Sequence, residues 1–399
     1  MLTSLAYILL LGMIMSKIFS KMGLPGLVGM IFTGIVLSPH ALNLLDTSLL
    51  SISADLRQLA LIIILTRAGL SLDFGDLKKA GRPAILMCFV PATLEILGTV
   101  ILAPKILGIT HIEAFLMGTV LGAVSPAIIV PRMLLLMENG YGTDKQIPQT
   151  ILAGASVDDI YVIVLFTAAM SVISEEKTSP LTLIQIPVSV VMGIVIGIAL
   201  GFILTKFFKK FHMRDTVKVM IILSISFLLI ELENRLKGIF PISGLLAIMS
   251  VGMIIYNTYK PLAKRLSVKY TKLWVFAEVM LFVLVGAQVD LSKAVQYGAK
   301  AILVVVCVTF FRVFGVFICF INTKLCFKER LFCAISALPK ATVQAAIGAL
   351  PLAAGLDCGE KILSASVLSI LIMAPIGGFL IDKFYKRLLT TEKPISDNN

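Results

Sequence analysis

Apolar stretches long enough to cross a lipid bilayer recur along almost the whole chain of 399 residues. A membrane-spanning helix needs about 20 mostly apolar residues, because the bilayer core offers no water to satisfy polar groups. Charged residues make up only 15% of the chain, whereas a soluble domain carries roughly 25%. The chain lacks the polar surface that a water-soluble protein needs, and we therefore expect an all-α, polytopic membrane protein.

The apolar stretches predict about 13 transmembrane helices, with no long polar linker between them, so we expect a single membrane domain over residues 1–399. The first stretch is interpreted as a helix rather than a signal peptide, because it has no basic start and no small-residue cleavage site. The predicted helices cover residues 2–19, 24–38, 56–72, 83–108, 112–137, 147–173, 182–208, 216–233, 240–258, 271–291, 298–321, 327–354 and 361–387.

Basic residues gather in every second loop of this predicted topology. They are Lys17, Lys21, Lys78, Lys79, Arg82, Lys206, Lys209, Lys210, Arg214, Lys260, Lys264, Arg265, Lys269, Lys324, Lys328, Arg330, Lys383, Lys386 and Arg387. Basic loops face the cytoplasm, so we expect a multi-pass protein of the cell membrane, with its N-terminus outside and its C-terminus in the cytoplasm. The net charge of +12 is interpreted as this orientation signal, and no nucleic-acid partner is expected.

Two segments of the chain repeat each other weakly. Gly69-Leu-Ser-Leu-Asp73 resembles Gly286-Ala-Gln-Val-Asp290, an offset of 217 residues (286 minus 69). The same offset pairs Gly81, Ala84, Ile85, Leu86 and Gly98 with Gly298, Ala301, Ile302, Leu303 and Gly315. The copies are seven predicted helices apart, an odd number, so they would cross the membrane in opposite senses. Such inverted-topology repeats are typical of secondary transporters, which bind substrate near the midplane.

Two adjacent aspartates, Asp158 and Asp159, lie well inside the sixth predicted helix. A charged residue at the bilayer centre costs at least about 2.5 kcal/mol, so packing does not explain them. A buried carboxylate binds a proton or a small cation, but not both at full strength, and this competition produces exchange when the site faces one side at a time. Neighbours on a helix point about 100° apart, so one aspartate should face the ion cavity and the other a neighbouring helix.

Prolines interrupt two of the predicted helices. Pro126 and Pro131 lie in the fifth, and Pro339 lies in the twelfth. A proline removes a backbone donor and frees carbonyl groups, and such backbone at membrane depth must line a cavity or be buried in protein. Paired interruptions in two inverted halves point to a transporter's binding site. We expect Ser125, beside the first break, to join the aspartates as an ion ligand, because hard cations prefer oxygen.

Further ionisable residues inside apolar stretches are Glu95, Arg312 and Lys340, with Arg67 and Glu278. Glu95 and Arg312 occupy equivalent positions of the repeat, again 217 residues apart (312 minus 95). Arg312 is expected to pair either with Glu95 or with Asp158, because a buried charge needs compensation. Arginine does not lose its proton in a protein, so its role should be electrostatic. Lys340, beside the second break, is expected to balance the negative ends of half-helices.

The segment from Gly118 to Val164, with Gly-Ala-Val-Ser-Pro-Ala-Ile-Ile-Val-Pro and Ala-Ser-Val-Asp-Asp, resembles the monovalent cation/proton antiporter superfamily. It is most similar to the NHA-type sodium/proton antiporters of animals and bacteria. The segment from Phe310 to Gly378, with Leu-Pro-Lys-Ala-Thr-Val-Gln-Ala-Ala-Ile-Gly, resembles the same group. The resemblance covers most of the chain, and the adjacent aspartates together with Pro-Lys-Ala-Thr-Val-Gln-Ala-Ala make it specific.

The resemblance implies a thirteen-helix fold like that of the NhaA and NapA antiporters, with two broken helices that cross. It implies a mobile core of helices in about 56–173 and 271–387, a dimerisation scaffold in about 2–38 and 182–258, and a homodimer with elevator-like motion. Asp159 would be the main ion and proton carrier and Asp158 its partner. Many electrogenic relatives carry lysine where this chain has Arg312, and this difference favours one cation per proton.

The leading hypothesis is exchange of Na⁺ or Li⁺ for H⁺, without a cofactor and without enzymatic chemistry. Exchange of K⁺ for H⁺ is an alternative within the same superfamily. An intramembrane aspartyl protease is the alternative from another class, but it needs two carboxylates about 3 Å apart, and neighbours on one helix diverge. A channel would not need a pair of titrating carboxylates.

Overall fold

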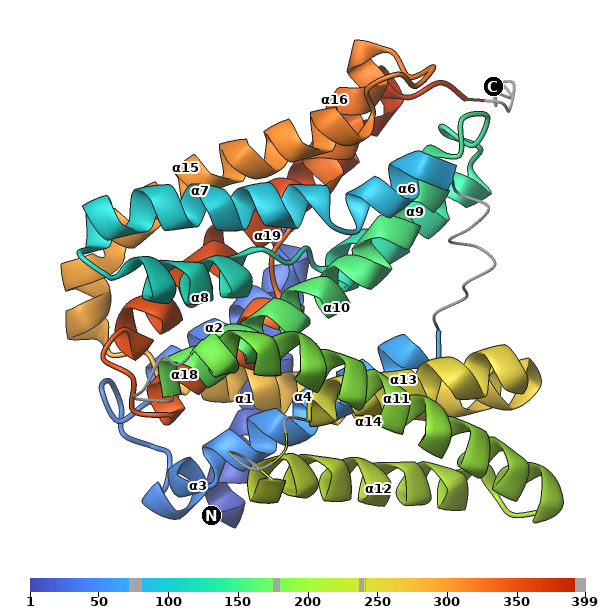
Figure 1. The fold of residues 1–399 in the computed structure, drawn as a ribbon. Coiled ribbons are helices and arrows are strands. Elements are labelled where there is room, and N and C mark those ends of the chain that lie inside the picture. Colours follow the sequence, from blue (N-terminus) through green and yellow to red (C-terminus); the bar gives the residue numbers. More distant parts are fainter. Residues whose placement is uncertain (72–80, 175–179, 237–239, 241, 392–399) are drawn as a thin grey trace. The chain divides into compact units, whose positions relative to one another are not determined.

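The structure is a computed structural model that describes residues 1–71, 81–174, 180–236, 240 and 242–391. Helices build the described part of the chain (Figure 1), where the one β-type contact is an isolated bridge between Tyr141 and Thr391. Among the residues singled out from sequence, Asp73 and the loop lysines Lys78 and Lys79 lie outside these ranges.

Each predicted span contains one helix or two or three shorter helices, so the predicted count is consistent with the structure. The helices are α1 (Leu2–Lys21), α2 (Gly26–Leu37), α3 (Thr47–Ser51), α4 (Ser53–Gly69), α6 (Gly81–Met87), α7 (Val90–Leu107), α8 (His111–Leu121), α9 (Pro126–Glu138), α10 (Ile147–Ser174), α11 (Pro180–Lys210), α12 (Asp215–Leu236), α13 (Gly244–Thr258), α14 (Lys260–Ala287), α15 (Leu291–Cys319), α16 (Phe327–Ser336), α17 (Thr342–Ile347), α18 (Leu350–Ala353) and α19 (Gly359–Leu388). In the described part, 8 helical stretches are long and apolar enough to cross a membrane, alongside shorter apolar helices.

The structure corrects two details of the predicted helices. The stretch predicted as one helix over 83–108 is divided, because α6 ends at Met87 and α7 begins at Val90. Pro131 does not interrupt its helix, since α9 continues through it from Pro126 to Glu138. The missing N–H of one proline removes a single helical hydrogen bond, and membrane helices tolerate this loss when local packing compensates for it.

The chain divides into two compact units. The first comprises the described parts of Met1–Leu49, Asp76–Phe166 and Phe282–Asn399. Within it α7 packs along α15, and α19 contacts α15, α16 and α8 (Figure 1). These contacts bring helices from the two copies of the sequence repeat side by side and surround the broken helices with helical neighbours.

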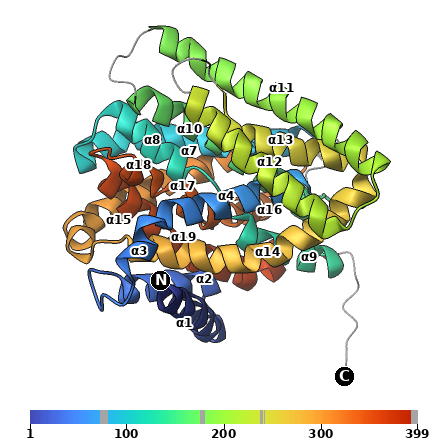
Figure 2. The ribbon, with the colours of Figure 1, turned by 90° about the horizontal axis from the view of Figure 1, so that it is seen from below.

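The second unit comprises the described parts of Leu50–Gly75 and Thr167–Leu281. Within it α13 packs against both α11 and α4, and α12 also contacts α13 (Figure 2). This division groups residues 1–49 with the broken helices, whereas the sequence placed residues 2–38 with a dimerisation scaffold. The roles of core and scaffold therefore stay predictions.

Glycines allow α2 to cross closely over the end of α14 in the first unit. A Cβ at Gly34 would meet the carbonyl of Val283, and a Cβ at Gly286 would meet the carbonyl of Ile31. Both helix backbones therefore approach at positions where any side chain would collide with the partner's main chain. Gly286 belongs to the repeated sequence motif, and this crossing gives it a packing role.

We expect Gly286→Leu to lower the stability of the purified protein by about 1 to 3 kcal/mol, because the added side chain forces α2 and α14 apart. Thermal unfolding in detergent measures this loss. Gly298→Ala is the matched control, since its Cβ would lie 3.9 Å from Leu368, an ordinary contact. Equal melting temperatures for the two variants would contradict the close crossing.

Candidate functional site

The two broken helices of the chain meet at their interruptions. The first break separates α8 from α9, and the second separates α16 from α17. The backbone N–H of Ser125 in the first break donates a hydrogen bond of 2.8 Å to the carbonyl of Pro339 in the second. The extended segments of the two halves are therefore in direct contact, at the point where both helices have stopped.

Proline chemistry explains where these helices resume or stop. Pro126 is the first residue of α9, a position where the missing N–H costs nothing because the first helical amides have no partner within the helix. Pro339 follows the end of α16 at Ser336 and precedes α17, which begins at Thr342. The break predicted at Pro339 is thus present, and the first break lies just before Pro126.

Side chains of the second half satisfy the carbonyls at the end of α8. Lys340 Nζ donates to the carbonyl of Leu121, and Arg312 Nη1 donates to the carbonyl of Gly122. Gln344 Nε2 donates to the carbonyl of Ala123 at 2.8 Å. The C-terminal end of a helix carries partial negative charge, so two cations and an amide are favourable neighbours there.

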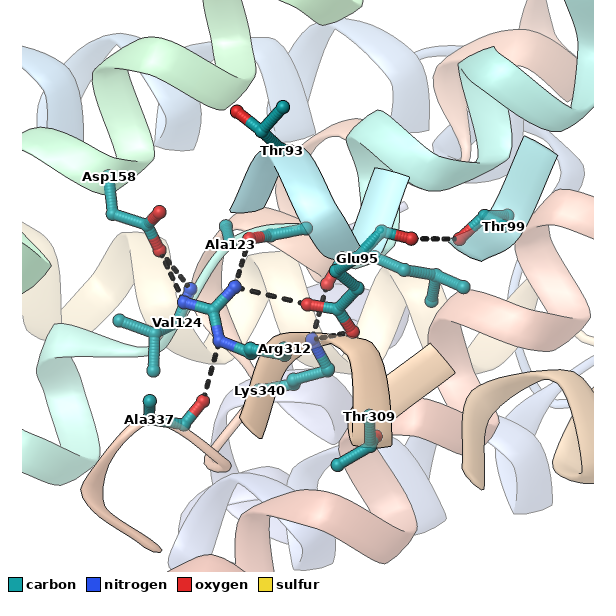
Figure 3. Close-up of polar contacts among 12 residues, drawn as sticks. Thr93, Glu95, Thr99, Ala123, Val124, Asp158, Thr309, Arg312, Ala337 and Lys340 are labelled. Atoms are coloured by element: carbon teal, nitrogen blue, oxygen red, sulfur yellow. Dashed lines mark hydrogen bonds and ion pairs between the residues drawn. The ribbon is translucent and has the colours of Figure 1, made fainter. Parts of the chain in front are cut away.

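Arg312 bonds to both of the partners that sequence analysis left as alternatives. Its Nη1 lies 3.0 Å from Glu95 Oε2, and its Nη2 lies 2.7 Å from Asp158 Oδ2 (Figure 3). Its Nε donates to the carbonyl of Ala337 at the end of α16, at 2.7 Å. The guanidinium therefore joins two carboxylates and the ends of both interrupted helices, while its side chain is only 2% exposed.

Lys340 completes a network of four buried charges. Its Nζ lies 2.7 Å from Glu95 Oε1, and both side chains are fully buried. Glu95 therefore stands between Lys340 and Arg312, as Figure 3 shows. Glu95 and Asp158 carry two negative charges, and Arg312 and Lys340 carry two positive charges, so the network is neutral as a whole. We refer to these four residues as the charge network.

The two adjacent aspartates of α10 have different surroundings. Asp158 is 1% exposed, and its Oδ2 accepts hydrogen bonds from the N–H of Val124 at 3.0 Å and from Arg312 at 2.7 Å. Asp159 is half-buried, and its Oδ1 has no hydrogen-bond partner in the structure. The divergence expected for neighbours on one helix is therefore present: Asp158 takes part in the charge network, and Asp159 lies outside it.

Ser125 offers a second oxygen without a partner. Its side chain is fully buried, and its Oγ accepts and donates no hydrogen bond in the structure. A buried hydroxyl without a partner costs free energy, so an unpaired one is a candidate ligand for a cation. Ser125 is the N-cap residue of α9, and the preceding residue, Val124, donates its backbone N–H to Asp158.

Sequence analysis gave no individual role to Gln344, although it lies in the quoted Pro-Lys-Ala-Thr-Val-Gln motif. The side chain is fully buried and links α17 to the end of α8. Its position in an apolar stretch just after a proline break was a usable signal, because a buried amide requires partners. The identity of those partners follows only from the crossing of the two halves.

Comparison with proteins of known family finds similarity over most of the chain. The sequence pattern of the family described as "Sodium/hydrogen exchanger, transmembrane" matches residues 6–387. The chain is 32% identical over 358 residues to Sodium/hydrogen exchanger 9B2 of Homo sapiens, and the matched region covers 84% of this chain and 64% of that protein. It is 31% identical over 388 residues to Sodium/hydrogen exchanger 9B2 of Mus musculus, and the matched region covers 92% of this chain and 69% of that protein. The chain therefore spans about two-thirds of these relatives.

The fold is also that of a solved antiporter. The structure of the sodium proton antiporter MjNhaP1 from Methanocaldococcus jannaschii at pH 8 superimposes with a TM-score of 0.83. The match covers 96% of this chain and 97% of that one, at 20% sequence identity. The likeness shows that the two chains share a fold.

We expect Glu95→Gln to lower stability by about 3 to 5 kcal/mol, because it leaves two buried cations with one carboxylate between them. The melting temperature of the purified protein in detergent measures the effect. Asp382→Asn is the control, since its ion pair with Arg132 is 2.7 Å long but its side chain is 57% exposed. An exposed pair contributes about 0 to 1 kcal/mol, and similar losses in both variants would contradict the burial of the network.

Exchanging the two charges of the Glu95–Arg312 pair should not restore transport. A carboxylate at position 312 would face Asp158 and the carbonyls of Gly122 and Ala337, all of which now accept hydrogen bonds from Arg312. Cation-driven proton movement in proteoliposomes measures this outcome for Glu95→Arg combined with Arg312→Glu. Recovery of transport in the double variant would mean that the ion pair between Glu95 and Arg312 acts independently of Asp158.

Proposed function

Because the chain belongs to the sodium/hydrogen exchanger family, we propose that it is a secondary active antiporter that exchanges Na⁺ or Li⁺ for H⁺. Asp159 is the carboxylate that binds the cation and the proton in turn. The observation that carries this proposal is the charge balance: the network of Glu95, Asp158, Arg312 and Lys340 is neutral, and Asp159 lies beside it as an extra carboxylate.

An extra carboxylate in an apolar setting needs a positive partner. A proton or a small cation each removes its charge, and both compete for the same oxygens. Asp159 Oδ1, Asp158 Oδ1 and Ser125 Oγ are buried oxygens without hydrogen-bond partners. Asp159 Oδ1 and Ser125 Oγ are the proposed ligands, because the carboxylate of Asp158 is already paired with Arg312 through its other oxygen. The carbonyls at the end of α8 are poor candidates, because donors from the second half already occupy them.

The same contacts favour exchange of one cation for one proton. Arg312 keeps its proton in a protein, and four acceptors hold it in place. Lys340 is held by Glu95 and by the carbonyl of Leu121. Asp158 is held by Arg312 and Val124. Asp159 is then the one group proposed to exchange a cation for a proton. Because one positive charge moves in each direction, transport moves no net charge.

Alternating access completes the proposal. The inverted repeat and the antiporter fold support a core that exposes Asp159 to each side of the membrane in turn. We propose an elevator-like movement, a homodimer, and a place in the cell membrane with the N-terminus outside and the C-terminus in the cytoplasm. The cation substrate and the lipid bilayer are the expected partners.

We expect Asp159→Asn to abolish cation-driven proton movement, because an amide cannot exchange a cation for a proton. The measurement uses purified protein in proteoliposomes with imposed Li⁺, Na⁺ or K⁺ gradients, with and without a clamped membrane potential. If only a K⁺ gradient drove proton movement, the substrate would be K⁺ and not Na⁺ or Li⁺. A rate that depends on the clamped potential would contradict the one-for-one exchange.

Asp382→Asn is the matched control, because it makes the same chemical change at an exposed ion pair outside the charge network. It should transport like the wild type. If Asp159→Asn retained wild-type transport in the same liposomes, the central assignment would be wrong.

A further inference from the structure

One peptide group joins Gln344 to Asp158. The peptide between Ala123 and Val124 presents its carbonyl to Gln344 Nε2, at 2.8 Å. The N–H of the same peptide donates to Asp158 Oδ2 at 3.0 Å. A trans peptide is planar, and its C=O and N–H point in opposite directions. A group that fixes the carbonyl on one side therefore also aims the amide on the other side.

The amide of Gln344 is itself held in one orientation. Its Nε2 faces two carbonyls, Ala123 at 2.8 Å and Leu121 at 3.5 Å, so its nitrogen and not its oxygen belongs on this side. The main chain is fixed as well, because Ser366 Oγ donates to the carbonyl of Gln344 at 2.7 Å. Gln344 is fully buried, so water does not compete for these contacts.

We propose that Gln344 is a positioning residue for ion exchange: it holds the Ala123–Val124 peptide so that its N–H keeps Asp158 within the charge network. The proposal rests on the proposed role of Asp159 as carrier. Arg312 and this N–H share the same oxygen of Asp158, so they fix the carboxylate from two directions. With Asp158 fixed, Asp159 is left as the carboxylate that a cation or proton reaches.

Loss of the Gln344 donor changes both sides of the peptide. The Ala123 carbonyl would lose its partner in a buried place, and a turned peptide would direct that carbonyl toward Asp158. Asp158 would then lose one of its donors and compete with Asp159 for the cation and the proton. The expected result is weaker and less selective cation binding rather than loss of the fold.

The test uses Gln344→Met, which keeps the length of the side chain without its donor, and Gln344→Glu, which keeps the shape and replaces the donor with a carboxylate. We expect each to raise the KM for Na⁺ about tenfold, with a smaller change in kcat, the size expected for a lost buried hydrogen bond. Transport in proteoliposomes gives KM and kcat. If Gln344→Met does not fold, Gln344→Glu decides the outcome.

Ser369→Ala is the control for the loss of a buried hydrogen bond in general, since its Oγ donates to the main-chain carbonyl of Ser366 and does not contact Gln344. It should keep the wild-type KM. A KM within twofold of wild type for the folded Gln344 variant would overturn the proposal. A lower KM in Gln344→Glu would also overturn it, because it would indicate direct contact between residue 344 and the cation.

Na⁺-dependent thermal stabilisation of the purified protein separates this proposal from the carrier assignment, since it reports binding without transport. In an Asp158→Asn background, Gln344→Met should weaken Na⁺ binding no further, because the two residues act through one peptide. An additional tenfold loss of Na⁺ affinity in this background would contradict the proposal that Gln344 acts on Asp158 through the Ala123–Val124 peptide. Continued transport by Asp159→Asn would refute the carrier assignment, whatever the Gln344 variants do.

Discussion

The rest of the structure depends on the neutral network of four buried charges where the two broken helices meet. A single charge in an apolar interior is costly, and a pair is tolerated only with good geometry and further hydrogen bonds. Here each carboxylate contacts a cation at 2.7 Å, and each cation also donates to a carbonyl at a helix end. The network therefore compensates its own charges and the backbone groups that the helix breaks release.

This arrangement explains why the interruptions and the charged residues occur together. Broken helices at membrane depth leave carbonyls that need donors, and Arg312, Lys340 and Gln344 supply them from the opposite half of the repeat. The donors in turn need negative partners, which Glu95 and Asp158 provide. A carboxylate outside this balance, Asp159, is then available for exchange, so the proposed chemistry follows from what the network leaves unpaired.

Much of the fold was readable from sequence because the bilayer permits few alternatives. The apolar stretches predicted the helices, and Pro126 and Pro339 predicted the two breaks. Pro131 shows the limit of that reasoning, because a proline interrupts a helix only where the surrounding packing does not compensate for one lost bond. The division between α6 and α7 was also missed, although Pro91, in the first turn of α7, marks the start of a new helix.

The sequence by itself determined the membrane class, the adjacent aspartates, the repeat and the family resemblance, because these depend on residue type and spacing alone. It left open whether Arg312 pairs with Glu95 or with Asp158, and the tertiary structure answered that it bonds to both. It also gave Gln344 no function. Those contacts join residues 154 to 221 positions apart, so they exist only after the two inverted halves have crossed and each has brought its donors to the other's broken helix.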